Sequence, residues 1–193
     1  EKGLGYIIRA PQTFSTNPLS PSEFTGNFAG TPNNGIVSVF VEGSDSAQKW
    51  NLLGNPYPSA ISADKFLDVE ENPDLYGTIY VWTHNTPLDP VPNSGGFYSY
   101  APSDYAVYNG VGGTSTDPSA VVYEGYIAAG QGFFVRGSAN GTATFNNQMR
   151  VTNQNSQFLR TPVSNRNASE KSRIWLNITN SQNAFTQTLI GYV

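Results

Sequence analysis

Short apolar runs recur along the chain, and clusters of Gly, Pro, Asn and Ser separate them. Such runs, rich in Val, Ile, Tyr, Phe and Thr and bounded by turn residues, are typical of β-strands. They predict strands at residues 5–9, 23–28, 36–41, 50–53, 78–83, 96–100, 121–127, 132–136, 142–145, 149–152, 173–179 and 185–192. Strands this short and this closely spaced favour a sandwich or a barrel.

Two segments predict how neighbouring strands connect. Residues 32–35, Pro-Asn-Asn-Gly, carry the residue types that supply the positive φ of a tight hairpin turn. Near the end of the chain, the polar loop 180–183 lets residues 173–179 and 185–192 pair as a second hairpin. We expect this hairpin to lie inside the sandwich, because native proteins rarely leave a long strand edge open.

The core is predicted from the alternation of apolar and polar residues. In the strand at 173–179, apolar residues alternate with Trp175, Asn177 and Thr179, so one face should be buried. The strand at 50–53 runs into a Gly-Asn-Pro-Tyr-Pro corner that continues neither a strand nor a helix. The residues that we expect in the core are Trp50, Leu52, Ile174, Leu176 and Ile178.

One short helix is predicted directly after this corner, near residues 62–72. Ser62 is a good N-cap, and Asp64 falls in the first turn, where a carboxylate interacts favourably with the helix dipole. Ile61 and Phe66 occupy the two positions of a hydrophobic staple. The Asn72-Pro73 pair then ends the helix.

These elements together predict an all-β fold, a mostly antiparallel and jelly-roll-like β-sandwich with one short helix. No shift in composition divides the chain, so residues 1–193 are expected to form a single module. The polar stretch 161–172 is interpreted as a long loop before the last hairpin rather than as a domain linker. Both termini read as strands without a leader, which suggests a piece of a longer multi-domain polypeptide.

Composition narrows the possible classes of protein. Charged residues make up 12% of the chain and aromatic residues 13%, a balance opposite to that of disordered chains. The ten Lys and Arg residues are spread singly, so we expect no binding to nucleic acid. No apolar run reaches the roughly 18 residues of a membrane span, so we expect no membrane insertion. The absence of cysteine excludes disulfides, thiolate nucleophiles and cysteine-ligated metals.

Five segments occur in an order that resembles a known type of surface module. They are WNLLGNPYPSAI at 50–61, IYVWTHN at 79–85, SDYAVYN at 103–109, IAAGQGFFV at 127–135 and RIWLN at 173–177. The series is similar to a β-rich module of large surface proteins of Bacteroidetes (flavobacteria). In those proteins it typically precedes a C-terminal sorting domain that the type IX secretion system recognises. The resemblance implies export, an extracellular or outer cell-surface location, and adjacent domains of the same polypeptide. It carries over no catalytic residues.

The segment 97–109 is the strongest candidate for binding. Aromatic faces flanked by carboxylates, amides and hydroxyls are typical of sugar sites, where the rings stack and the polar groups contact hydroxyls. The candidate ligand-binding residues are Trp82, Tyr98, Tyr100, Asp104, Tyr105, Tyr108 and Asn109. The competing interpretation, which we favour, is that the tyrosines pack a long loop onto the sandwich.

Other candidates for chemistry are sparse. The single histidine, His84, precedes a turn, and we interpret it as structural because no second His or Cys accompanies it. Carboxylates gather around the predicted helix, and we interpret them as a solvated face, with a calcium ion as the alternative. These carboxylates are Asp64, Asp68, Glu70, Glu71 and Asp74. Ser46 in Asp45-Ser46-Ala47 matches the O-glycosylation pattern that the resemblance implies.

No nucleophile elbow, phosphate loop or dinucleotide fingerprint occurs in the chain, and Gly110–Thr114 reads as a glycine-rich loop. We therefore expect a protein that is not an enzyme and needs no cofactor. The leading hypothesis is a module for adhesion or surface architecture, whose partner is a glycan or a surface protein. The alternative hypothesis is a carbohydrate-binding module that uses the tyrosine-rich loop. A third hypothesis is a hydrolase, which a cleft with two facing carboxylates of perturbed pKa would favour.

Overall fold

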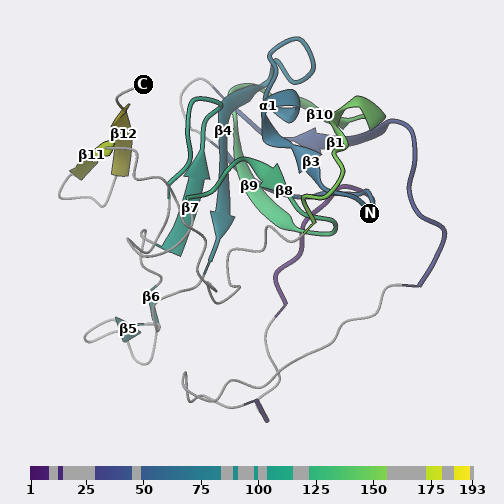
Figure 1. The fold of residues 1–193 in the computed structure, drawn as a ribbon, viewed down its shortest axis with the longest axis horizontal. Coiled ribbons are helices and arrows are strands. Elements are labelled where there is room, and N and C mark those ends of the chain that lie inside the picture. Colours follow the sequence, from purple (N-terminus) through teal and green to yellow (C-terminus); the bar gives the residue numbers. More distant parts are fainter. Residues whose placement is uncertain are drawn as a thin grey trace.

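The computed structural model describes residues 1–8, 13–14, 29–44, 49–83, 89–90, 98–99, 104–114, 122–155, 173–179 and 185–191. The strands are β1 (Val37–Val41), β2 (Lys49–Gly54), β3 (Ile61–Ser62), β4 (Leu75–Trp82), β5 (Asp89–Pro90), β6 (Tyr98–Ser99), β7 (Tyr105–Tyr108), β8 (Tyr126–Ile127), β9 (Gly132–Gly137), β10 (Gly141–Phe145), β11 (Arg173–Thr179) and β12 (Phe185–Gly191). The helical elements are α1 (Ala63–Phe66) and the 3-10 turn η2 (Asn147–Met149) (Figure 1). For β5, β6, β11 and β12 the description covers the backbone alone.

The largest sheet has four strands in the order β2-β9-β4-β7, and all its neighbouring strands are antiparallel. The pairs β1–β10, β3–β8, β5–β6 and β11–β12 are also antiparallel. Among the described residues α1 is the one α-helix. The predicted all-β, antiparallel class with one short helix is therefore confirmed, while the jelly-roll-like sandwich stays a prediction.

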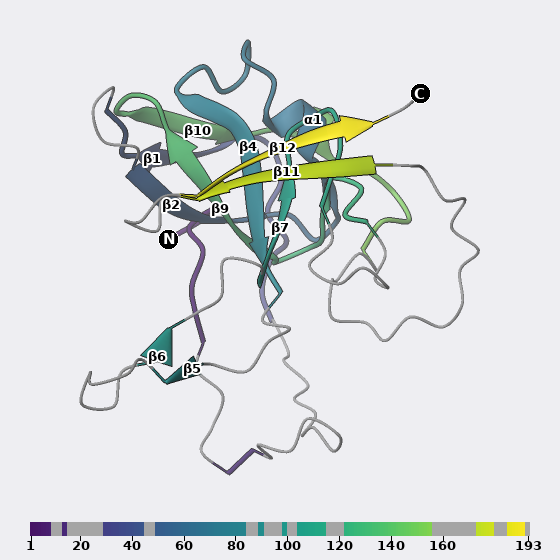
Figure 2. The ribbon, with the colours of Figure 1, turned by 90° about the vertical axis from the view of Figure 1, so that its left-hand side faces the viewer.

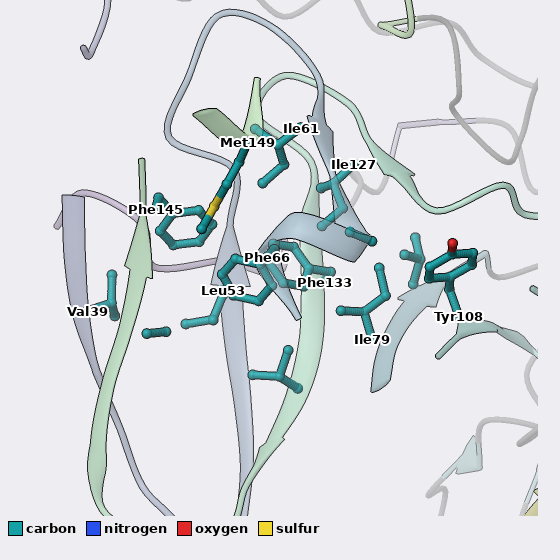
Figure 3. Packing of buried hydrophobic residues seen from close by; sticks show 14 of the residues in the cluster. Val39, Leu53, Ile61, Phe66, Ile79, Tyr108, Ile127, Phe133, Phe145 and Met149 are labelled. Atoms are coloured by element: carbon teal, nitrogen blue, oxygen red, sulfur yellow. The ribbon is translucent and has the colours of Figure 1, made fainter. Parts of the chain in front are cut away.

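The core is formed by one face of the four-stranded sheet, the β1–β10 pair and α1. Along β1 and β9 every second residue is buried, which is the period-2 pattern of strands with one face in a core. Phe66 of α1 stacks on Phe145 of β10 at 4.9 Å and meets Phe133 of β9 edge-on at 5.3 Å. Figure 3 shows these rings packed together with Leu53, Ile61, Ile127 and Met149.

Asn55 fixes the corner that follows β2. Its buried side-chain amide donates to the carbonyls of Ser59, Ile127 and Ala128, at 2.9, 3.0 and 3.0 Å. Its Oδ1 accepts from the N–H of Tyr57 at 3.0 Å. A single side chain thus satisfies backbone groups on both sides of the corner, groups that would otherwise be buried without a partner.

The start of α1 follows the prediction. Ser62 is the N-cap, and its hydroxyl accepts from the N–H of Lys65 at 3.5 Å. Asp64 lies in the first turn, and both Ile61 and Phe66 are buried. The predicted extent of 62–72 is wrong, because the helix ends at Phe66. The buried amide of Asn72 donates to the carbonyl of Phe66 at 2.7 Å and to that of Thr144 at 3.1 Å, which ties the following turn to β10.

The predicted face of β2 is also wrong. Trp50 is 56% exposed and Leu52 is half-buried, whereas Leu53 is 1% exposed and belongs to the core. Apolar residues stand on both faces of this strand, so their alternation does not say which face is inside. Ile174, Leu176 and Ile178, the other predicted core residues, have side chains outside the described part.

Several predicted strands are absent or shorter in the structure. Residues 5–8 are not a strand. The chain pairs with β2 closer to its N-terminus, through Gly3, Leu4 and Gly5. In the segment 121–127 the strand is confined to β8. At 149–152 the chain leaves η2 and makes an isolated bridge between Arg150 and Ile61. The predicted strand at 23–28 lies outside the described residues.

The hairpin predicted at 32–35 is wrong as well. Gly35 has the expected positive φ of 79°, but the residues from 29 to 36 form no strand, and β1 pairs with β10 instead. The side chain of Asn33 donates to the carbonyl of Pro56 at 2.9 Å. The asparagines of this segment therefore anchor a connection to the corner rather than close a tight turn.

The hairpin predicted at the end of the chain is confirmed. β11 pairs with β12 over its whole length, from Arg173 with Gly191 to Thr179 with Phe185. The hairpin lies to the left of the four-stranded sheet in Figure 1 and in front of it in Figure 2. The two views agree that it is on the side of the sheet opposite α1.

Candidate functional site

The tyrosine-rich segment contains a strand, β7, that sequence reasoning missed. β7 pairs with β4, so that Ile79 lies opposite Tyr108 and Trp82 opposite Tyr105. Successive residues of a strand point to opposite faces. Tyr108 and Tyr105 therefore lie on different sides of the sheet, although the sequence suggests one continuous binding loop.

Tyr108 belongs to the core. It is 8% exposed, its ring packs edge-on against Tyr123 at 6.0 Å, and its hydroxyl donates to Oδ1 of Asp64 at 2.7 Å. Burial raises the pKa of Tyr108 above its ordinary value, and the hydrogen bond to Asp64 raises it further. A ring and a hydroxyl held in this way cannot contact a sugar.

Asp104 and Asn109 are also part of the framework. Asp104 is 1% exposed, and its carbonyl accepts from both the N–H and the hydroxyl of Thr83 at 2.7 Å. Asn109 is exposed, but its Oδ1 accepts from the N–H groups of Val111 and Gly112, both at 3.2 Å. This Asx-turn closes the predicted glycine-rich loop after β7.

The predicted site is thus only partly assembled. Trp82 and Tyr105 are half-buried neighbours on adjacent strands. The backbone of Tyr98 pairs with Pro90 in the β5–β6 hairpin, and its side chain lies outside the described part. Tyr100, Ser46 and His84 also lie outside the described residues.

A more extensive surface is the outer face of the four-stranded sheet, the face directed away from the core. Pairing registers set its members side by side, because Trp50 lies opposite Arg136 and Leu52 opposite Phe134. The members from all four strands are Trp50, Leu52, Tyr80, Trp82, Tyr105, Val107, Phe134 and Arg136. We call this set the aromatic face.

The rings of the aromatic face contact one another edge-on. Trp50 meets Tyr80 at 4.8 Å and 76°, and it meets Phe134 at 6.4 Å and 88°. Tyr105 meets Phe134 at 5.9 Å and 73°. Such contacts are favourable for packing, but rings that cross steeply do not present one flat platform to a sugar ring.

Arg136 completes the aromatic face. Its guanidinium carbon lies 5.7 Å from the ring centre of Trp50 and 5.2 Å from that of Tyr76, within the range of cation–π attraction. Burial raises the pKa of Tyr80, and the nearby charge of Arg136 opposes this rise. The arginine stem therefore serves as one more packing element between aromatic side chains.

The carboxylates around α1 do not converge. Asp64 accepts from Tyr108, Asp68 from the N–H of Glu70 at 3.0 Å, and Glu71 from the amide of Asn146 at 2.8 Å. Among the described residues, no group of three or more His, Cys, Asp or Glu side chains is arranged to hold a metal ion. The described part also contains no helix with the length and hydropathy of a membrane span.

The buried tyrosines predict a loss of stability at alkaline pH. Burial raises the pKa of Tyr108 and Tyr123 above the ordinary 10.0, so the unfolded chain releases these protons first as pH increases. Their stabilisation is therefore full below pH 10 and is lost as pH rises further, by up to about 1.4 kcal/mol per pH unit for each group. Urea denaturation between pH 8 and 11 would measure this slope.

A matched pair of variants tests the assignment of that slope. Tyr108→Phe should reduce the slope, because it removes one titrating group from the core. Tyr6→Phe is the matched comparison, at a tyrosine that is 67% exposed. Equal slopes in both variants would contradict the role given to Tyr108.

The aromatic face was not predicted from the sequence for the same reason that the buried face of β2 was predicted wrongly. Tyr80 and Trp82 alternate with Ile79 and Val81, so β4 is apolar on both faces. One pattern in the sequence could have identified this face. Two neighbouring strands each carry large apolar residues at odd and at even positions, which is expected when both faces of a sheet are covered.

Comparison with known proteins assigns the family. A family model described as "Domain of unknown function (DUF8693)" matches residues 1–193, which is the whole chain, so the chain belongs to this family. No curated protein and no solved structure matches the chain.

Proposed function

We propose that this family member is a non-catalytic extracellular module that serves in surface architecture or adhesion. The observation that carries the proposal is that the four-stranded sheet is apolar on both faces. Antiparallel sheets with one face in water alternate apolar and polar residues. A second apolar face is therefore a surface built for contact with another structural element.

The polar side chains in the candidate segment and next to it support contact rather than chemistry. Asp104 is buried, Asn109 closes a turn and Asp64 accepts from Tyr108. What remains on the outer side of the sheet is a group of large rings around one arginine. Aromatic residues and arginine are the types enriched where proteins pack against other surfaces.

The occupant that we assign to the aromatic face is the β11–β12 hairpin of the same chain. The hairpin lies on that side of the sheet in both ribbon views (Figures 1 and 2). Its register sets Ile174 opposite Ile190 and Trp175 opposite Leu189, so both of its faces carry apolar residues. In this arrangement the sheet supports the β11–β12 hairpin within the same chain.

Hydrogen exchange on the whole chain tests this occupant. We expect amides from 174 to 190 to be protected, and Phe134→Ala to increase their exchange because it removes a central ring of the aromatic face. Phe40→Ala is the matched control, since Phe40 is 64% exposed on β1. Equal exchange of the hairpin in the two variants would contradict the assignment.

The extracellular location has its own test. Protease treatment of intact producer cells should remove the chain, while a cytosolic marker protein stays intact. Protection of the chain until the cells are lysed would overturn this part of the proposal.

A second candidate function, carbohydrate binding, is favoured by one observation. Trp82 and Tyr105 lie side by side on the aromatic face, and Trp50 on the same face is 56% exposed. On a glycan array the architectural function gives no hit that depends on these rings. A hit that Tyr105→Ala abolishes would favour the second candidate instead.

A further inference from the structure

A hollow of about 340 Å³ opens beside the corner that follows β2. Its lining residues are Ser59, Asn147, Arg150, Val151 and Thr152, from the corner and from the chain around η2. The hollow is shallow and largely open to solvent, so a ligand would be contacted on one side only. The lining combines one cation, two hydroxyls, an amide and an apolar side chain.

Arg150 is held in place by its surroundings. Its backbone bridges to Ile61, and the next N–H, that of Val151, donates to the carbonyl of Ala60 at 2.9 Å. The Nε–H of Arg150 donates to the hydroxyl of Ser59 at 2.9 Å, and its guanidinium carbon lies 5.5 Å from the ring centre of Tyr57. The guanidinium is therefore oriented before any ligand arrives, which lowers the entropic cost of binding.

The charge of Arg150 is not neutralised within the described part of the chain. Among those residues the one ion pair joins Lys49 and Glu42, at 3.0 Å. Besides the bond to Ser59, Arg150 makes one long hydrogen bond, from Nη1 to Oδ1 of Asn34 at 3.4 Å. A guanidinium has five N–H donors, so three remain for a ligand.

Charges of both signs lie beside η2. The ammonium group of Lys65 donates to the carbonyl of Gln148 at 2.7 Å, which places a second positive charge on the η2 segment. The carboxylate of Glu71, in the turn that follows α1, accepts from the amide of Asn146, so a negative charge lies beside η2 as well. The anion preference of the hollow therefore rests on Arg150 itself.

We propose that Arg150 and the hollow form a binding site for a small hydroxylated carboxylate, of the kind that a uronic acid presents. The planar fork of arginine matches the two oxygens of a carboxylate. The hydroxyls of Ser59 and Thr152 are suited to sugar hydroxyls, and Val151 provides an apolar wall. Asn147 can offer its side-chain N–H groups, because its Oδ1 already accepts from the N–H of Gly35 at 3.2 Å. The site lies away from the aromatic face and does not depend on the proposed function.

A purely structural role is the competing explanation for Arg150. The cation–π contact with Tyr57 and the bond to Ser59 would then stabilise the corner and bind nothing. The two explanations differ in a measurable way, because only a binding site responds to ligand in the folded protein.

The test is an NMR titration of the whole protein with glucuronate, with glucose and acetate as reference ligands. We expect saturable shifts at the amides of Ser59, Val151 and Thr152 with glucuronate. Glucose should give none, because it lacks the charge, and acetate should bind about tenfold more weakly, because it lacks the hydroxyls. No saturable shift with glucuronate, shifts centred elsewhere, or an equal response to glucose would overturn the proposal.

Two variants test the role of the arginine. Arg150→Lys keeps the charge but loses the fork, and it should weaken glucuronate binding by about tenfold. Arg150→Gln should abolish the binding. Lys49→Gln is the control, because it removes one positive charge at the opposite end of β2 and should leave the affinity unchanged. Unchanged affinity in folded Arg150→Lys and in Arg150→Gln would refute the site.

Discussion

Replacing Asn55 with Asp should destabilise the protein by about 3–5 kcal/mol at neutral pH, the range for removing one partner of a buried charged or polar pair. The two side chains have nearly the same shape, so packing is preserved. The amide of Asn55 donates to three carbonyls, of Ser59, Ile127 and Ala128. A carboxylate has no hydrogen to donate, so it would be buried with its charge directed at three oxygens.

The pH dependence of this variant is part of the prediction. Burial against carbonyls raises the pKa of the introduced carboxyl above its ordinary value of about 3.9. A carboxyl with a raised folded-state pKa contributes stability that is present at low pH and lost as pH rises through that pKa. Below this pKa the introduced carboxyl is protonated, and its O–H can donate to one of the three carbonyls. The difference in unfolding free energy from the parent protein should therefore narrow between pH 7 and pH 4.

Asn51→Asp is the matched control for Asn55→Asp. Asn51 also uses its amide to bond backbone carbonyls, those of Glu42 at 2.8 Å and Lys49 at 3.2 Å, but it is only half-buried near the start of β2. Urea denaturation of both variants at pH 7 and pH 4 gives the comparison. Similar losses in the two variants would show that the corner is not held by the buried amide of Asn55.

Local signals predicted the framework of this protein well. β1, β9, β10, β11 and β12 lie where short apolar runs between turn residues place them. The start of α1 follows from Ser62, whose hydroxyl caps the helix, and from the apolar pair around it. These features depend on a few neighbouring residues, so the sequence alone contains the information.

Features that depend on distant partners were not predictable in the same way. The length of α1 is set by Asn72, which bonds the carbonyl of Phe66 and the backbone of β10. Arg150 leaves η2 to bridge Ile61, so residues 149–152 form no strand. In both cases a contact between residues far apart in sequence overrides the local pattern.

The candidate site shows the same division. The tyrosines of the segment 97–109 suggested one sugar-binding loop, but the pairing of β7 with β4 separates Tyr105 from Tyr108. Tyr105 lies on the aromatic face, and Tyr108 lies in the core. Both faces of β2 and β4 carry large apolar residues, so neither the core face nor the aromatic face could be chosen from the sequence.

Phe133 and Phe134 allow a direct comparison of the two faces, because they are neighbours of the same type on β9. Phe133 is fully buried and contacts Phe66 and Phe145. Phe133→Ala should reduce the free energy of unfolding by about 3–5 kcal/mol, through lost burial and the cavity that remains. Phe134→Ala should cost only about 1–2 kcal/mol, since Phe134 is half-buried and mainly loses edge-on ring contacts.

The two variants should also differ in tryptophan fluorescence. The ring centres of Phe134 and Trp50 are 6.4 Å apart, so Phe134→Ala should change the tryptophan emission of the folded protein. Phe133→Ala should change stability with little effect on that emission. Urea denaturation followed by fluorescence measures both quantities on one sample. Equal destabilisation by the two variants would mean that the outer face is packed as tightly as the core. The aromatic face would then be a second core that the β11–β12 hairpin closes completely, rather than a face that the hairpin covers only in part.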